Sequence, residues 1–197
     1  MRTILLAIWI LLPIGAWAYH EGPGQDLVAL DSADAKLAAA HEHALAGKWS
    51  LSVKSYEEAL RALPKDRLAE ARRARLELNK ARMQDSKLPE AHADLRAMVE
   101  ELQNDPTADP KVLAGARSAH ANAQYYMTWL MRLEGLPREQ WEPEVEAARQ
   151  TYRLLAEEAV AAGDAEAAGR HRADLESAVR LARMELKDLQ GLPLPSQ

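Results

Sequence analysis

This chain of 197 residues contains no cysteine and no phenylalanine, and aromatic residues make up only 5% of it. Without cysteine the chain can form no disulfide, hold no metal through a thiolate and use no cysteine nucleophile. It also has no cysteine that could carry a lipid at the start of a mature form. Alanine and leucine dominate and β-branched runs are few, so we expect helices that pack closely on helices.

The sequence also lacks the short motifs that mark common catalytic sites. It has no glycine-rich phosphate loop, no nucleophile elbow and no HExxH zinc motif. His41 and His43 are two residues apart, whereas two ligands on one helix face need a spacing of three or four. We therefore predict no metal, no cofactor and no enzymatic activity. The alternative is an enzyme whose acids and histidines converge from distant helices.

Charge is unevenly distributed along a mildly acidic chain of net charge -5, which has no overall basic character for binding nucleic acid. Residues 61–87 carry a net charge of +5, whereas residues 89–110 carry -5. The basic stretch has two interpretations. It could recruit an acidic partner or an anionic surface, or it could form a helix whose charges pair with those of the acidic neighbour.

The first 18 residues have the pattern of a secretory signal peptide. Arg2 precedes the apolar run Ile4–Ile14, and Ala16 and Ala18 are the small residues that signal peptidase reads, with cleavage before Tyr19. We thus expect a periplasmic or secreted protein. An uncleaved membrane anchor is the main alternative, and a buried core helix is the other.

Local breakers divide the remaining chain into a leader, a helical domain and a tail. Gly22-Pro23-Gly24 predicts a flexible leader over residues 19–31, and Gly191 with two prolines predicts a disordered tail over residues 191–197. Between them, apolar residues at helical spacing and N-cap or stop residues predict about seven helices within residues 32–190. The first helix is expected to run to residue 46 from a cap at Asp31, Ser32 or Asp34. The other expected ranges are 50–63, 66–85, 89–103, 110–134, 143–162 and 164–189.

One stretch, residues 37–64, has the most regular spacing of small, aromatic and turn residues. Its key positions are Ala40, Gly47, Trp49, Ser52, Tyr56, Ala59 and Pro64. This stretch resembles a tetratricopeptide repeat, although Lys36 stands where that family has a large aromatic residue. The resemblance implies an all-α superhelix of antiparallel helix pairs, which binds peptides or proteins in a concave groove.

Weaker copies of the pattern follow. Aliphatic residues recur 39 positions after the first repeat, at Leu88, Ala91, Leu95 and Met98. Residues 152–168 fit the pattern again, so the register after residue 110 stays open. Either helix 143–162 closes a third repeat and helix 164–189 caps the array, or these last two helices form a repeat of their own.

The resemblance also implies which residues face the groove, because the first helix of each pair lines it. In the long helix 110–134 an aromatic cluster with an arginine nearby has the composition of a binding hot spot. The alternative is that these aromatic residues pack against the following helix. The candidate partner-binding residues are His41, Arg73, Lys80, Gln84, Asn122, Tyr125, Trp129 and Arg132. We thus expect an exported interaction scaffold or adaptor for a protein or peptide, and the alternatives are the enzyme above, including one that acts on the cell wall, or a structural subunit of an envelope complex.

Overall fold

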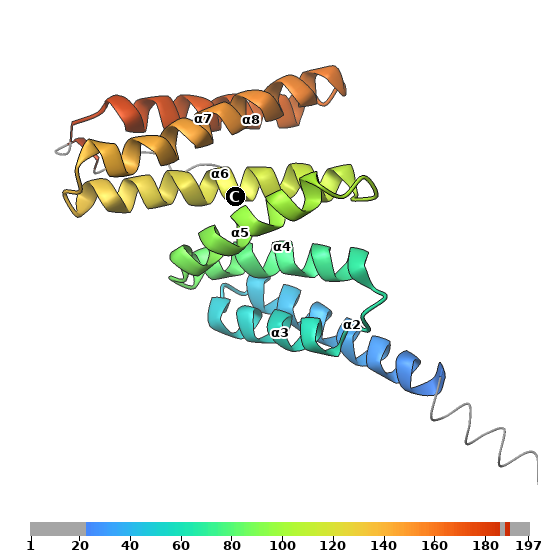
Figure 1. The fold of residues 1–197 in the computed structure, drawn as a ribbon. Coiled ribbons are helices and arrows are strands. Elements are labelled where there is room, and N and C mark those ends of the chain that lie inside the picture. The colour runs from blue at the N-terminus through green and yellow to red at the C-terminus, as the bar shows by residue number, and fades with distance from the viewer. Residues whose placement is uncertain (1–22, 186–187, 190–197) are drawn as a thin grey trace, which may run out of the picture. The chain divides into compact units, whose positions relative to one another are not determined.

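The structure is a computed structural model that describes residues 23–185, 188 and 189. Within these residues it contains seven α-helices and no strand, so the all-α prediction is confirmed (Figure 1). The chain divides into two compact units, Met1–Ala74 and Arg75–Gln197, with the boundary inside one helix. The predicted signal segment, residues 1–18, and the predicted tail, residues 191–197, lie outside the described residues.

The first unit is built on the antiparallel pair α2 (Pro23–Leu45) and α3 (Trp49–Ala62). Gly47 has φ +67 in the short turn between them, a conformation that favours glycine. Across the pair, the Ser52 hydroxyl donates to the carbonyl oxygen of Ala40 at 2.9 Å, and both residues are 0% exposed. Two of the small residues that the repeat pattern singled out thus lie where α2 packs on α3.

Two boundary predictions for this unit are wrong. Helix α2 begins at Pro23, so residues 23–31 are helical and not a flexible leader; proline is well suited to a first helical turn. Helix α3 begins at Trp49 with Lys48 as its N-cap residue, and Ser50 lies inside the helix. The predicted end holds, since Leu63 adopts ψ 130 before Pro64, as residues before proline do.

The second unit comprises the end of α4 (Leu68–Gln84) followed by α5 (Leu88–Gln103), α6 (Pro110–Leu133), α7 (Arg138–Ala161) and α8 (Ala165–Arg183). Side-chain N-caps support two of these starts, because Asp109 accepts from the Lys111 amide and Asp164 from the Ala167 amide. Helix α6 packs against α5 and α7, and α7 also packs against α8 (Figure 1).

Two hydrophobic clusters hold this unit together, one on each side of α6. The first joins α4, α5 and α6 and includes Leu95, Met98 and Ala116, and the second joins α6, α7 and α8 and includes Tyr152, Ala178 and Leu181. The aliphatic residues predicted to replace the repeat's aromatics on α5 are all buried in the structure. Helix α6 is therefore the central element of the second unit's core.

Helix α7 starts earlier than the sequence suggests. Pro143 lies inside it as the sixth residue, although we expected a break at this proline. Helix α7 begins at Arg138, directly after Pro137, which is its extended N-cap residue. Helix α8 ends at Arg183, earlier than the predicted residue 189, yet Leu189 is 0% exposed within the second cluster. None of the helices in the described ranges is both long and apolar enough to cross a membrane.

Candidate functional site

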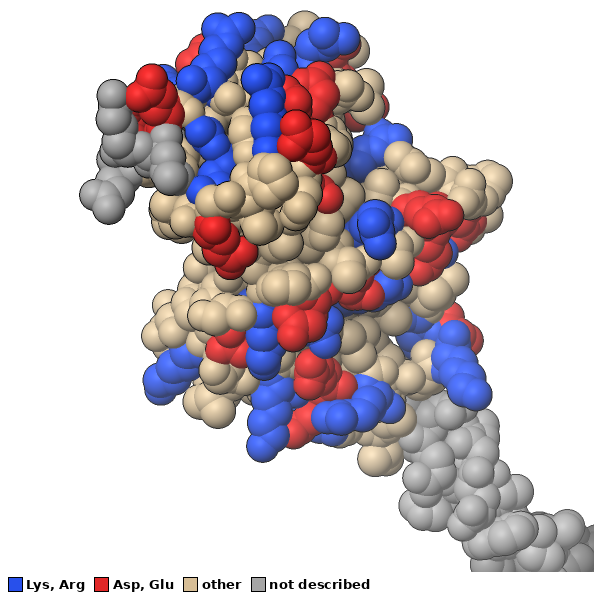
Figure 2. Space-filling model, turned by 60° about the vertical axis from the view of Figure 1, so that its left-hand side comes forward, with Lys and Arg blue, Asp and Glu red and all other residues tan. Residues whose placement is uncertain are grey.

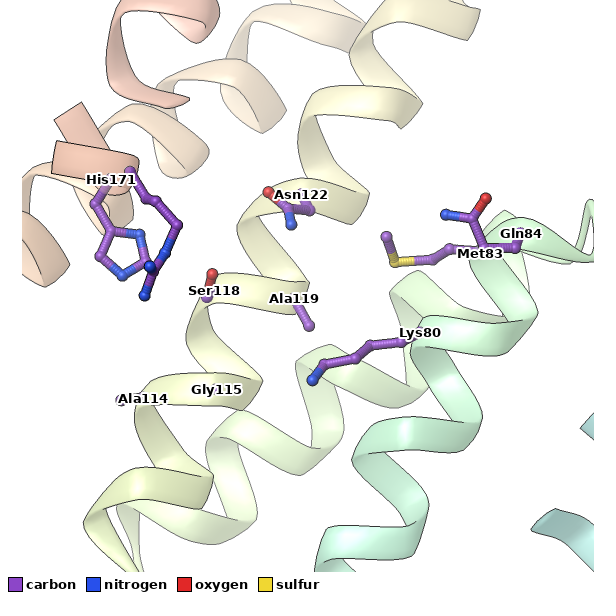
Figure 3. A pocket seen from close by; sticks show the side chains of 10 residues that line it. Lys80, Met83, Gln84, Ala114, Gly115, Ser118, Ala119, Asn122 and His171 are labelled. Carbon is purple, nitrogen blue, oxygen red and sulfur yellow. The ribbon is translucent and has the colours of Figure 1, made fainter. Parts of the chain in front are cut away.

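A cavity of about 300 Å³ lies in the second unit, between α4, α6 and α8. Figure 3 shows α6 in the middle, with Lys80 and Gln84 reaching in from α4 and His171 from α8. The residues that line it are Lys80, Met83, Gln84, Ala114, Gly115, Ser118, Ala119, Asn122, Arg170 and His171. Three helices that are not neighbours in sequence thus contribute to one cavity.

Small residues on one face of α6 make room for this cavity. Gly115, Ser118 and Asn122 are three and four residues apart, so they share a face of the helix. At Gly115 an added Cβ would lie 3.0 Å from Leu76 Cδ2 of α4. Glycine therefore permits α6 to approach this part of α4 closely, just beside the cavity.

The lining carries positive charge and neutral polar groups, and no Asp or Glu is among it. Lys80 pairs with Glu77 at 2.8 Å and Arg170 with Glu166 at 2.5 Å, each within its own helix and at the exposed surface. Exposed pairs of this kind contribute little to stability and exchange readily for another anion. The cavity can thus accept a negatively charged group between its two cations.

The histidine of the cavity is half-buried and poorly partnered. His171 Nδ1 is buried without a hydrogen bond, and the carboxylate of Asp174 lies 3.9 Å away. Burial lowers the pKa of His171 below its usual value, and Asp174 opposes this shift only in part. The imidazole is therefore mainly neutral at pH 7 and can exchange a hydrogen bond with a ligand.

Asn122 is held in place at the back of the cavity. The hydroxyl of the buried Tyr152 on α7 donates to Asn122 Oδ1 at 2.6 Å, and Asn122 is 6% exposed. Burial, with the carboxylate of Asp174 nearby, raises the pKa of Tyr152, so this hydroxyl keeps its proton. The bond fixes the rotamer of Asn122 in the cavity wall.

Three of the eight predicted binding residues come together at this cavity, namely Lys80, Gln84 and Asn122. His41 and Arg73 belong to the first unit, are exposed and are not among the lining residues. Arg170, His171 and Ser118 line the cavity but were not predicted. The sequence left two roles open for the last helix, a cap of the array or part of a repeat with the helix before it. Extending the alternate-helix pattern from α4 and α6 to α8 is the signal that indicates positions 170 and 171.

The other three predicted residues have contacts inside the molecule. Tyr125 is 1% exposed and packs edge-on against Tyr126, and burial raises its pKa to about 12. Trp129 is partly buried against the α6–α7–α8 cluster. Arg132 donates to the carbonyls of Leu181 and Met184 at the end of α8. These three side chains therefore contribute to packing and capping, away from the cavity lining.

The charge stretches are paired at one place within the second unit. Arg75 on α4 bonds to Asp94 of α5 through its Nε and to Glu101 at 3.0 Å. Burial alone would raise the pKa of Asp94, but hydrogen bonds from Arg75 and Asn79 outweigh it and hold the pKa below its usual value. Figure 2 shows Lys and Arg side chains beside Asp and Glu side chains over the displayed face. Pairing between the basic and acidic stretches is thus present at Arg75.

A histidine–carboxylate pair lies elsewhere in the second unit. His92 Nε2 of α5 is 3.1 Å from Glu144 Oε2 of α7, and neither residue lines the cavity. Among the residues that the structure describes, no group of three or more His, Asp or Glu side chains could hold a metal ion. The pair therefore connects α5 with α7.

Comparison with known proteins gives no match to a protein-family model, to a curated protein or to a solved structure. The resemblance of residues 37–64 to a tetratricopeptide repeat rests on the residues themselves and stays a prediction.

Proposed function

We propose that this chain is a binding protein that takes up a negatively charged segment of a partner polypeptide in the cavity between α4, α6 and α8. The observation that carries the proposal is the lining of this cavity. Lys80 of α4 and Arg170 of α8 contribute to this lining, together with polar side chains of α6. An acidic or C-terminal carboxylate group can pair with both cations, while amide and hydroxyl groups bind the peptide backbone.

The repeat-like sequence supports the same function. Three residues expected to face a peptide groove border this cavity, and they come from α4 and α6, which are alternate helices of the array. In this proposal the chain acts as a tetratricopeptide-like scaffold or adaptor. It is exported through its first 18 residues to the periplasm or outside the cell, which a mature mass that begins at Tyr19 would support.

Fluorescence anisotropy with two labelled peptide pools, one rich in Asp and Glu and one rich in Lys and Arg, tests the binding. The wild type should bind the acidic pool only, and the double variant Lys80→Ala/Arg170→Ala should bind it at least tenfold more weakly. The matched control is Lys111→Ala/Arg172→Ala, which removes two exposed cations outside the lining. Equal binding by both variants, or no binding of either pool by the wild type, would contradict the proposal.

An enzyme is the second candidate function, and one specific observation favours it. The pairing of His92 with Glu144 resembles the orientation of a general base by a carboxylate. The cavity lies elsewhere, however, and no nucleophile is placed beside His92 by any contact described above. We therefore keep binding as the main proposal, and hydrolysis of the peptide pools, followed by mass spectrometry, separates the two.

A further inference from the structure

Three titratable side chains from three helices meet on one side of α6. The cavity residues Gly115, Ser118 and Asn122 lie on the opposite side of this helix. His120 of α6 lies with its ring centroid 5.2 Å from that of His92 on α5, with an angle of 36° between the ring planes. His92 Nε2 is in turn 3.1 Å from Glu144 Oε2 on α7. We name His92, His120 and Glu144 the imidazole cluster; it connects α5, α6 and α7 at one point.

His120 is the member of the cluster that is least able to carry a charge. Its Nε2 atom is buried and has no hydrogen-bond partner. Burial is the main cause that lowers the pKa of His120 to about 4, and positive charge on His92 and Arg96 of α5 acts in the same direction. Glu144 opposes this, but its carboxylate already accepts from His92, which holds the pKa of Glu144 below its usual value.

We propose that the imidazole cluster is an acid-sensitive clasp, which holds α6 against α5 and α7 while His120 is neutral and loosens when His120 is protonated. Protonation would place a poorly solvated cation in a ring whose centroid lies 5.2 Å from that of His92. Within the cluster, Glu144 is the one carboxylate that can balance charge on the two imidazoles. Such a charge costs free energy unless the buried Nε2 atom reaches water. In this proposal it does so through a movement of α6. Because α6 also supplies the middle wall of the cavity, this movement would change the cavity's shape.

The pH range follows from linkage. In the unfolded chain a histidine binds its proton near pH 6.5, whereas folded His120 does so only near pH 4, so the unfolded state binds more protons between these values. The stability that neutral His120 provides is therefore present above pH 6.5 and is lost as the pH falls toward 4. Between pH 7 and pH 5 this one group should raise the unfolding equilibrium constant about 20-fold.

Two measurements on the full chain test the clasp. Histidine NMR titration of the wild type should give His120 a pKa well below 6, and hydrogen exchange, corrected for intrinsic rates, should show selective loss of protection in α6 at pH 5. Helices α2 and α3 of the first unit serve as internal reference. A His120 pKa near 6.5, or equal loss of protection in all helices, would overturn the proposal.

A variant pair isolates the contribution of His120 to the pH dependence. The variant His120→Met removes the titrating group and keeps a side chain of similar length. In urea unfolding, the rise of the unfolding equilibrium constant from pH 7 to pH 5 should therefore be about 20-fold smaller in this variant than in the wild type. His41→Gln removes an exposed histidine from α2 and should keep the wild-type pH dependence. If the two variants lose stability equally with acid, the clasp is wrong; if His120→Met does not fold, the NMR and exchange results above decide.

Discussion

The guanidinium of Arg75 on α4 lies against the carboxylate of Asp94 on α5, with Nε 3.0 Å from Oδ2 and 3.1 Å from Oδ1. Asn79, which is 0% exposed, donates to the same carboxylate. Asp94 on α5 thus accepts hydrogen bonds from two side chains of α4, and these bonds hold this part of α4 against α5. This relationship explains how a strongly basic helix fits beside an acidic one within the second unit.

Replacement of Asp94 should therefore destabilise the protein more than loss of a surface acid. We expect Asp94→Ala to lower the free energy of unfolding by about 2 kcal/mol, because the donors of Arg75 and Asn79 lose their acceptor. Glu101→Ala removes only the outer contact of Arg75 and should cost less than about 1 kcal/mol. Urea unfolding of both variants measures the difference, and equal losses would show that the Asp94 contacts carry no special weight.

Replacement by alanine should change the free energy of unfolding in opposite directions at Gly163, in the turn before α8, and at Gly169, inside α8. Gly169 lies inside α8 with open space around its Cβ position, so Gly169→Ala should raise the free energy of unfolding by about 0.5–1 kcal/mol. Gly163 has φ +75 in the turn before α8, so Gly163→Ala should lower it by about 1 kcal/mol. Thermal unfolding checks both; a stabilising Gly163→Ala would contradict the turn geometry.

Much of the fold could be predicted because helix ends are set locally. Gly47, Pro64 and Gly163 stop helices through their own backbone preferences, whereas Asp109 starts a helix through its side-chain cap. The structure places a helix boundary at each of them. Pro143 could not be assigned this way. A proline six residues into a helix and a proline at its start look alike in the sequence, and packing of Trp141 and Val145 in the core decides between them.

The candidate site could be predicted only in part, for a related reason. Spacing places Asn122, Tyr125 and Trp129 near one another on α6, but it does not say which neighbours cover that helix. Helix α8 and Leu189 complete the core around Tyr125, whereas α8 stays far enough from Asn122 and Ser118 to leave a cavity. These contacts join residues more than 40 positions apart, so only the folded chain reveals them.

The proline inside α7 should be a stability defect that can be repaired. Pro143 has no amide proton for the carbonyl of Glu139, so Pro143→Ala should raise the free energy of unfolding by about 1–3 kcal/mol. Pro110→Ala is the control, because Pro110 is the first residue of α6, where no amide bond is needed and no gain is expected. Chemical denaturation compares the two, and a loss of stability in Pro143→Ala would mean that the ring packs favourably.

Arg132 separates the two interpretations of the aromatic end of α6. Its guanidinium donates to the carbonyls of Leu181 and Met184 at the end of α8, and it lies 4.8 Å from the Trp141 ring centroid. Arg132→Ala should therefore lower the free energy of unfolding by about 2 kcal/mol and weaken amide protection in the last turn of α8. Lysine at this position should restore only part of the loss, because an ammonium cannot place two parallel donors.

The control for this experiment is Arg138→Ala. Arg138 lies 6.0 Å from the same Trp141 ring but is exposed and pairs with Glu142 on the surface, so its loss should lower the free energy of unfolding much less than the loss of Arg132 does. If Arg132→Ala keeps full stability yet weakens binding of the acidic peptide pool, the capping contacts have no energetic weight and Arg132 is a binding residue, as its spacing on the helix first predicted. If stability falls and binding by the folded fraction is unchanged, Arg132 acts by holding α8 in place. In that case α8 keeps Arg170 and His171 at the cavity through a contact at its opposite end.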